Sequence, residues 1–124
     1  MPARKPDPLG PEHVAAVEAA LDRGEEPERG ALRSAARYLL LELERAAPGR
    51  SVEVRVPPVA AVQCVAGPRH TRGTPPNVIE IDPVTWVRLA TGRLSWAEAA
   101  GAGLVRASGP RADLAGYLPL TVSK

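Results

Sequence analysis

Side chains that could act as nucleophiles are few in this sequence. It contains one cysteine, Cys64, and two histidines, His13 and His70. A reactive cysteine needs a nearby cation or base that stabilises its thiolate, whereas Cys64 shares a strand face with Val62, which favours a small buried side chain. His70 approaches Cys64 only if the turn that carries it folds back. We therefore expect no catalytic residue.

Metal and cofactor sites are not expected either. One cysteine excludes a zinc cluster of cysteines, and two histidines cannot build a three-histidine site. Glu80 and Asp82 form a carboxylate pair, but strand alternation turns Glu80 toward solvent, and Asp82 stands where the next helix needs an N-cap. No glycine-rich phosphate loop leads directly into a helix. The sequence thus predicts no metal site and no cofactor.

A basic turn at 67–77 contains Arg69, His70 and Arg72. No aromatic side chain is interleaved for base stacking, and the net charge of the chain is only +2, so we expect no nucleic acid partner. A solvated turn is the favoured interpretation of this cluster. Capture of an anionic headgroup or a carboxylate is the alternative.

Two tryptophans account for half of the aromatic residues, alongside two tyrosines and no phenylalanine. Trp86 and Trp96 lie on either side of Gly92, where a helix must end and the chain must reverse. Large indole side chains either anchor a core or line an apolar cavity. Both interpretations remain open from the residues alone.

The elements that position these residues belong to one domain. The chain has 124 residues, of which 44% are hydrophobic and 24% charged, as is typical of a globular protein. Apolar residues repeat at three and four positions over 11–23 and 30–47, which predicts two helices. Leu39, Leu40 and Leu43 belong to the apolar stripe of the second helix, and we expect that stripe to cover a sheet.

Four strands are expected, at 51–56, 59–66, 77–81 and 104–107. Alternation in the first of them turns Val52, Val54 and Val56 to one face. We expect the inner face of the sheet to consist of these three residues with Val62, Ile79, Ile81 and Val105. The second strand is apolar on both faces apart from Gln63, so we expect it at the centre of the sheet.

Further helices are expected after the third strand. Asp82 is the expected N-cap of one of them, and Ser95 with Glu98 forms the capping box of a second, short one. A last short helix is expected from Pro110 to about Gly116. Strands that cluster and are then separated by helices predict an α+β fold, with a mainly antiparallel sheet covered by helices.

The ends of the chain carry separate expectations. Residues 1–10 include three prolines and are expected to form a disordered tail, which leaves 11–124 as a single domain. No run of eighteen apolar residues occurs, and the start of the chain lacks the apolar segment of a signal peptide. We therefore expect a cytoplasmic protein without integral membrane insertion, and we leave its oligomeric state open.

The spacing of three glycines and one alanine resembles the sterol carrier protein family. Ala99 lies seven residues after Gly92, Gly103 lies eleven after it, and Gly109 follows six residues later. The segment 103–109 looks like the family's strand between two glycines. The short length and the arginine and alanine bias resemble the actinobacterial branch of that family. The module is also similar to the C-terminal domain of mycothiol-dependent maleylpyruvate isomerase-like proteins.

This resemblance implies non-catalytic binding of a lipid or other apolar ligand, such as a fatty acid or fatty acyl thioester, in a cavity between helices and sheet. The residues expected to line that cavity are Trp86, Leu89, Leu94, Trp96, Leu104 and Leu118. Arg88 or Arg93 would meet a headgroup at the mouth, and the C-terminal stretch that carries Leu118, Leu120 and Val122 would close over it. The alternative is an accessory domain of the same fold that binds a protein partner and no ligand.

Overall fold

The computed structural model describes residues 7–67 and 77–120 of the chain. Its helices are α1 (Gly10–Asp22), α2 (Arg29–Ala46), α3 (Pro83–Ala90) and α4 (Trp96–Gly101), followed by the 3₁₀ turn η1 (Ala115–Tyr117). Its strands are β1 (Val52–Val56), β2 (Ala60–Cys64), β3 (Asn77–Ile81) and β4 (Val105–Ser108). All four expected strands are present, and each lies within two residues of its expected bounds.

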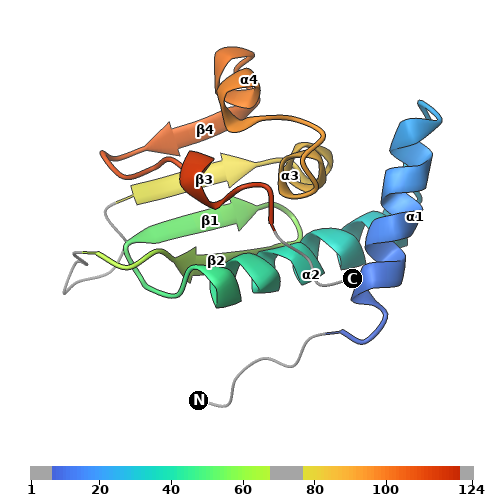
Figure 1. Ribbon diagram of the computed structural model, residues 1–124, viewed down its shortest axis with the longest axis horizontal. Helices are drawn as coiled ribbons and strands as arrows, with labels where there is room; N and C mark the ends of the chain where they lie inside the picture. Colours follow the sequence, from blue (N-terminus) through green and yellow to red (C-terminus); the bar gives the residue numbers. More distant parts are fainter. Residues whose placement is uncertain (1–6, 68–76, 121–124) are drawn as a thin grey trace.

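The strands form one open sheet in the order β2-β1-β3-β4 (Figure 1). β1 pairs antiparallel with β2, and β3 pairs antiparallel with β4. The central pair, β1 and β3, runs parallel, with Val54 opposite Ile79. The α+β fold with a mainly antiparallel sheet is therefore confirmed.

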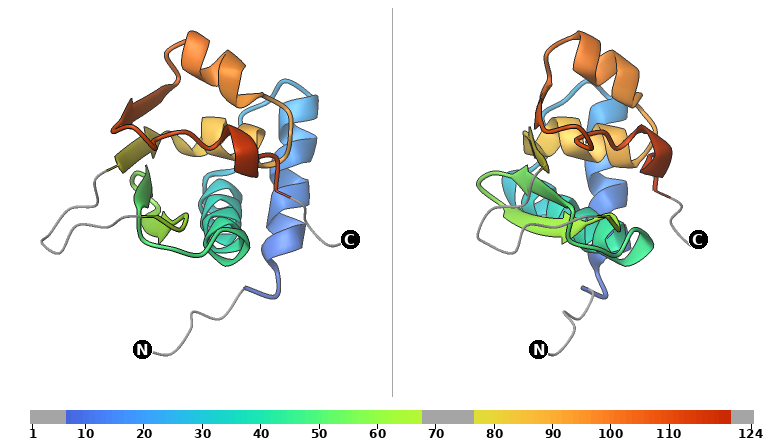
Figure 2. Two further views of the ribbon diagram at one scale, coloured as in Figure 1. Left: turned by 60° about the vertical axis from the view of Figure 1, so that its left-hand side comes forward. Right: turned by 90° about the vertical axis from the view of Figure 1, so that its left-hand side faces the viewer.

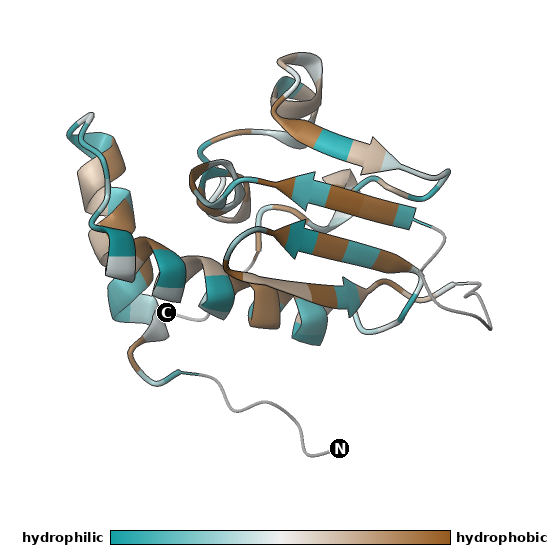
Figure 3. Ribbon diagram, turned by 180° about the vertical axis from the view of Figure 1, so that it is seen from behind, coloured by the Kyte–Doolittle hydropathy of each residue, from teal (hydrophilic) through white to brown (hydrophobic). Residues whose placement is uncertain are grey.

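Alternating side chains give the sheet one buried face. The buried side chains are Val52, Val54 and Val56 of β1, Val62 of β2, and Ile79 and Ile81 of β3. On β1, Glu53 and Arg55 point to the opposite face and remain partly exposed. Figure 3 shows the alternation as brown and teal bands, viewed from the side on which the strands lie in front of the helices. The expected inner face is confirmed at these positions, while Val105 at the β4 edge is only partly buried.

Helix α2 covers this buried face. Leu39, Leu40 and Leu43 are all fully buried, and burial of three leucines contributes roughly 5–9 kcal/mol before chain entropy is subtracted. Helix α1 packs on the side of α2 away from the strands and adds Val14 and Val17 to the same core (Figure 2). The helices thus form layers on one side of the sheet.

The placement of β2 differs from the sequence-based expectation. β2 lies at the edge of the sheet and pairs only with β1 among the described strands, so the prediction of a central strand over 59–66 was wrong. Ala61 is exposed and Gln63 is partly exposed on its outer face. Alanine has little apolar surface, so its exposure on the outer face costs little free energy, and an apolar strand that contains several alanines can lie at the edge of the sheet.

The helix-start signals were sufficient to place both helices after β3. The Asp82 carboxylate accepts a hydrogen bond from the Thr85 N–H at 3.1 Å, as an N-cap should. Ser95 and Glu98 form the complete capping box of α4. The prediction of a last helix from Pro110 to about Gly116 was wrong, because residues 110–114 are not helical and only the 3₁₀ turn η1 follows them.

Some expectations fall outside the described residues. These are the tail at 1–6, the basic cluster of Arg69, His70 and Arg72, and the last apolar residue, Val122. Residues 7–10 are described, and α1 begins at Gly10, one residue before the expected start of the first helix. Across the described ranges, no helix combines the length and the apolar character needed to cross a membrane.

Candidate functional site

A groove runs between the start of α4 and the segment that follows η1. Its volume is about 390 Å³, which lies in the range of small-molecule sites. We call it the α4 groove. Its lining consists of Gly92, Leu94, Ser95, Trp96, Ala97, Glu98, Ala115, Leu118 and Pro119.

Two local features shape the α4 groove. Gly92 has φ +83°, the left-handed conformation in which glycine ends a helix and reverses the chain. On the opposite wall, the N–H of Leu120 donates to the carbonyl of Ala90 at 2.9 Å and ties the C-terminal segment to the end of α3. Leu118 and Pro119 are thereby held in the groove lining together with Trp96. Of the C-terminal residues expected to close over the site, Leu118 lines the groove and Leu120 is buried in the core.

Three of the six expected lining residues meet in the α4 groove. Leu94, Trp96 and Leu118 come from the α3–α4 connection, α4 and the segment after η1, and all three are partly buried against the core. Their side chains present apolar surface to the groove. These residues make the groove the best candidate for the expected apolar site.

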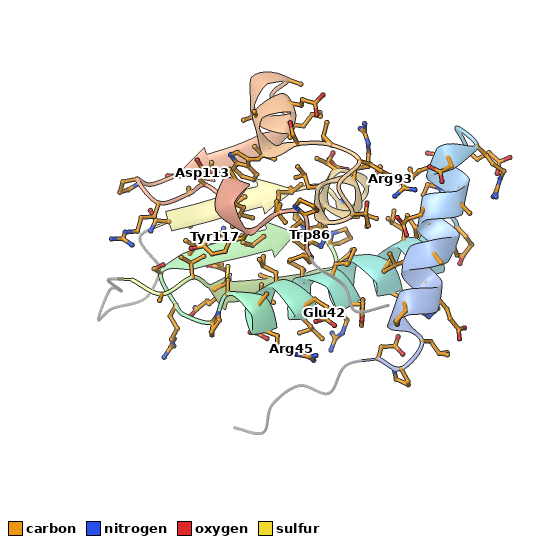
Figure 4. The ribbon with its side chains drawn as sticks, viewed as in Figure 1. Glu42, Arg45, Trp86, Arg93, Asp113 and Tyr117 are labelled. Atoms are coloured by element: carbon orange, nitrogen blue, oxygen red, sulfur yellow. The ribbon has the colours of Figure 1, made fainter. Side chains whose placement is uncertain are left out.

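The other three expected lining residues lie elsewhere. Trp86 and Leu89 are fully buried in the core, and the Trp86 Nε1–H donates to the carbonyl of Ala36 in α2 at 3.1 Å. Figure 4 shows Trp86 between α3 and α2. Leu104 is 39% exposed just before β4 and does not line the groove. Of the two interpretations of the tryptophans, core anchor therefore fits Trp86 and cavity lining fits Trp96.

Arg93, one of two expected headgroup residues, is committed to another contact. Its guanidinium forms ion pairs with Glu18 and Asp22 of α1, the latter at 3.0 Å. Figure 4 shows the side chain reaching from the α3–α4 connection toward α1. The side chain of Arg93 is only 28% exposed. Arg88, the second candidate, is partly buried on α3 and does not line the groove.

The polar part of the groove wall is the capping box of α4. The Ser95 N–H donates to Oε1 of Glu98 at 2.9 Å, and the Glu98 N–H donates to the Ser95 hydroxyl at 3.0 Å. Two hydrogen bonds with Ser95 hold the pKa of Glu98 below its ordinary value: the backbone N–H has the larger effect and the hydroxyl the smaller one. Glu98 is therefore a carboxylate at neutral pH. The sequence predicted this capping box but gave no sign that it lines a site.

Ala115 and Pro119 were also missed. They approach α4 through the C-terminal segment, and neither residue belongs to a motif with a recognised binding role. The one usable signal was the apolar tail after Gly116, which predicted closure over the site without saying which residues would line it.

A second, smaller hollow lies between the start of α2, the β1–β2 turn and the start of α3. Its volume is about 290 Å³. Its lining consists of Arg29, Leu32, Arg33, Pro58, Val59 and Pro83. None of the expected site residues lies there, so the α4 groove remains the candidate.

The environment of Cys64 matches a buried apolar position. Its side chain is fully buried in β2. Burial, and to a lesser extent the charge of Glu44, raises the pKa of the thiol to about 11. A thiol with such a pKa is a poor nucleophile at neutral pH. Within the described ranges, no group of three His, Cys, Asp or Glu side chains is arranged to hold a metal ion.

Slow thiol labelling is the expected result for the native protein. A shift from the ordinary value of 9.0 to about 11 lowers the thiolate fraction on the order of a hundredfold, and burial slows access further. At about pH 8, denaturant should therefore raise the rate of labelling of Cys64 by a factor on the order of a hundred or more. Equal rates for folded and unfolded protein would contradict the buried position of Cys64.

The same thiol predicts a pH dependence of stability. The folded state favours the neutral thiol, because its pKa there is raised from 9.0 to about 11. The resulting contribution to the free energy of unfolding is fully present below about pH 9 and is lost as the pH rises to about 11. Denaturant unfolding across this range should show the loss. In a Cys64→Ala variant measured at the same pH values, this part of the decrease in the free energy of unfolding should be absent.

Comparison with known proteins adds a family. The sequence model of a family described as "Bacterial SCP ortholog" matches residues 28–120, well over half of the chain. The matched range contains every residue of the α4 groove and leaves α1 outside. No curated protein matches the chain.

Proposed function

The chain belongs to the bacterial SCP ortholog family, and on this basis we propose that it binds a lipid or other apolar ligand in the α4 groove without changing it chemically. The expected sterol carrier protein-like family is thereby confirmed, and membership suggests apolar ligand binding in general terms. The observation that carries the choice of site is the meeting of Leu94, Trp96 and Leu118 in one groove.

Burial of apolar surface would supply the affinity. Each methylene group that leaves water contributes about 0.8 kcal/mol, and a chain of some ten carbons could therefore supply roughly 8 kcal/mol, which corresponds to a micromolar Kd. The volume of about 390 Å³ suits a ligand of this size, or one end of a longer acyl chain. Ordering of ligand and side chains lowers the affinity from this upper value.

The non-catalytic part of the proposal draws on the groove's own chemistry. Ser95 and Glu98 satisfy each other in the capping box, so neither is poised as a nucleophile or base. The cysteine thiol lies in β2, outside the lining of the groove. We therefore expect the bound ligand to be recovered unaltered when protein purified from its own host is analysed by native mass spectrometry. We also propose a cytoplasmic location, which fractionation of that host would test.

The two tryptophans provide a direct test of binding. With only two indole N–H groups in the chain, titration of ¹⁵N-labelled protein with 1-decanol should shift the Trp96 resonance saturably. The Trp86 resonance should stay in place, because that N–H is buried and bonded to Ala36. Binding in the core instead would move both resonances.

A matched pair of variants locates the binding site. Leu118→Asp replaces apolar groove surface with a charge and should weaken decanol binding about tenfold, a factor that corresponds to about 1.4 kcal/mol of lost apolar contact. Leu104→Asp, at an exposed position outside the groove, should leave it unchanged. No shift of Trp96, or equal binding by both variants, would refute the proposal and favour the accessory-domain alternative.

A further inference from the structure

Glu98 is the one ionisable side chain among the described residues that line the α4 groove. Its position is fixed by the capping box, in which Oε1 accepts the Ser95 N–H. Because this hydrogen bond requires an acceptor oxygen, the carboxylate cannot turn away from the groove wall without losing this half of the capping box. A fixed negative charge therefore stands at the edge of a mostly apolar site.

The nearby arginines do not offset this charge inside the groove. Arg93 directly precedes the lining residue Leu94, yet its guanidinium is held by the two carboxylates of Glu18 and Asp22 on α1. Arg88 contributes a weaker charge interaction with Glu98 but does not line the groove. An anionic headgroup in the groove would therefore meet Glu98 before it met a free guanidinium.

From this arrangement we infer that the α4 groove selects apolar ligands with an uncharged headgroup, such as long-chain alcohols or esters, and that Glu98 is the residue that disfavours fatty acid anions. This inference rests on the proposed function, because it assigns the ligand class of the same groove. It also revises the expected role of Arg93, which serves as a link between α1 and the groove wall and not as a headgroup site.

The size of the effect follows from the exposure of the site. Two unit charges about 4 Å apart in water-like surroundings repel enough to change binding about fivefold. Salt screens an exposed pair of this kind. The ratio of the affinities for uncharged and anionic ligands should therefore be largest at low ionic strength and should approach one near 1 M salt.

Three ligands with the same ten-carbon chain test the inference. Decanol, kept below its solubility limit, and decanoate and decylammonium, each kept below its micellar concentration, are titrated against the Trp96 indole resonance at neutral pH. We expect decanoate to bind about fivefold more weakly than decanol. Decanoate bound by Arg29 and Arg33 in the second hollow would be recognised because it would leave the Trp96 resonance in place.

A Glu98→Gln variant supplies the decisive comparison. The glutamine oxygen can still accept the Ser95 N–H, so the helix cap is kept while the charge is removed. Relative to decanol, decanoate should bind about fivefold more tightly to the variant than to the wild type, and decylammonium should bind more weakly by a similar factor. Opposite shifts for the two charged ligands cannot arise from a general structural effect. Glu26→Gln, which removes an exposed carboxylate outside the groove, should change none of the three affinities.

The outcomes separate this inference from the proposed function. If decanol binds but decanoate binds equally well or better, or if Glu98→Gln leaves their ratio unchanged, the assigned ligand class is wrong while the groove remains a binding site. If none of the three ligands moves the Trp96 resonance, the proposed function fails and the ligand class fails with it.

Discussion

Replacement of Trp86 by alanine is expected to lower the free energy of unfolding by about 3–5 kcal/mol. Trp86 is the largest side chain in the fully buried core, and it connects α3 to α2 through both packing and the hydrogen bond from Nε1 to the Ala36 carbonyl. Alanine would leave a cavity between these helices and remove that bond. Against a total stability of about 5–15 kcal/mol, a loss of this size is large.

Two further variants separate packing from hydrogen bonding. Trp86→Phe keeps most of the apolar volume and loses the donor, so we expect a smaller loss of about 1–3 kcal/mol. Trp96→Ala removes a partly buried side chain at the α4 groove and should cost less than Trp86→Ala. Denaturant unfolding monitored by circular dichroism measures all three. Equal losses at the two tryptophans would contradict their different environments.

Local signals in the sequence were sufficient to predict most elements of the fold. Alternation along Val52, Val54 and Val56 identifies β1 and its buried face because one strand carries the whole pattern. The Ser95–Glu98 capping box identifies the start of α4 within four residues. Predictions of this kind succeed because every group involved lies close together in the chain.

Long-range relations were less predictable. Arg93 pairs with Glu18 and Asp22, which precede it by more than seventy residues, and no local pattern marks that partnership. The two tryptophans flank the same glycine, yet the helical phase of α3 turns Trp86 toward α2 while Trp96 begins the next helix at the groove. The edge position of β2 depends on which strand β1 pairs with on its other side. Burial patterns alone could not decide these points.

Gly49 illustrates the same distinction. The sequence marks it as part of the stop of α2, after Pro48, but the structure gives it a second role at the contact with the end of β2. A Cβ atom on Gly49 would lie 2.2 Å from the backbone carbonyl of Val65. That strand end is fixed on both sides, because the Val65 N–H donates to Ala47 and its carbonyl accepts from Ser51.

A Gly49→Ala variant is therefore expected to lose about 2–6 kcal/mol of stability. One part of the loss comes from φ +150°, a conformation that side-chain-bearing residues rarely adopt. The other comes from the overlap with the Val65 backbone, which cannot move without breaking its hydrogen bonds. Because the contact joins the α2–β1 connection to β2, the loss should appear as reduced cooperative stability of the whole domain and not as local fraying.

Two other glycines provide the controls that divide this effect. Gly24 has φ +70° but open space where a Cβ atom would lie, so Gly24→Ala should cost only the backbone part, about 1–2 kcal/mol. Gly101 lies in α4 with open space around it and no positive φ, so Gly101→Ala should be neutral or stabilise by up to about 1 kcal/mol. Thermal and denaturant unfolding should rank Gly49→Ala as the least stable of the three. A Gly49 variant no less stable than the Gly24 variant would show that the approach to Val65 does not constrain the fold.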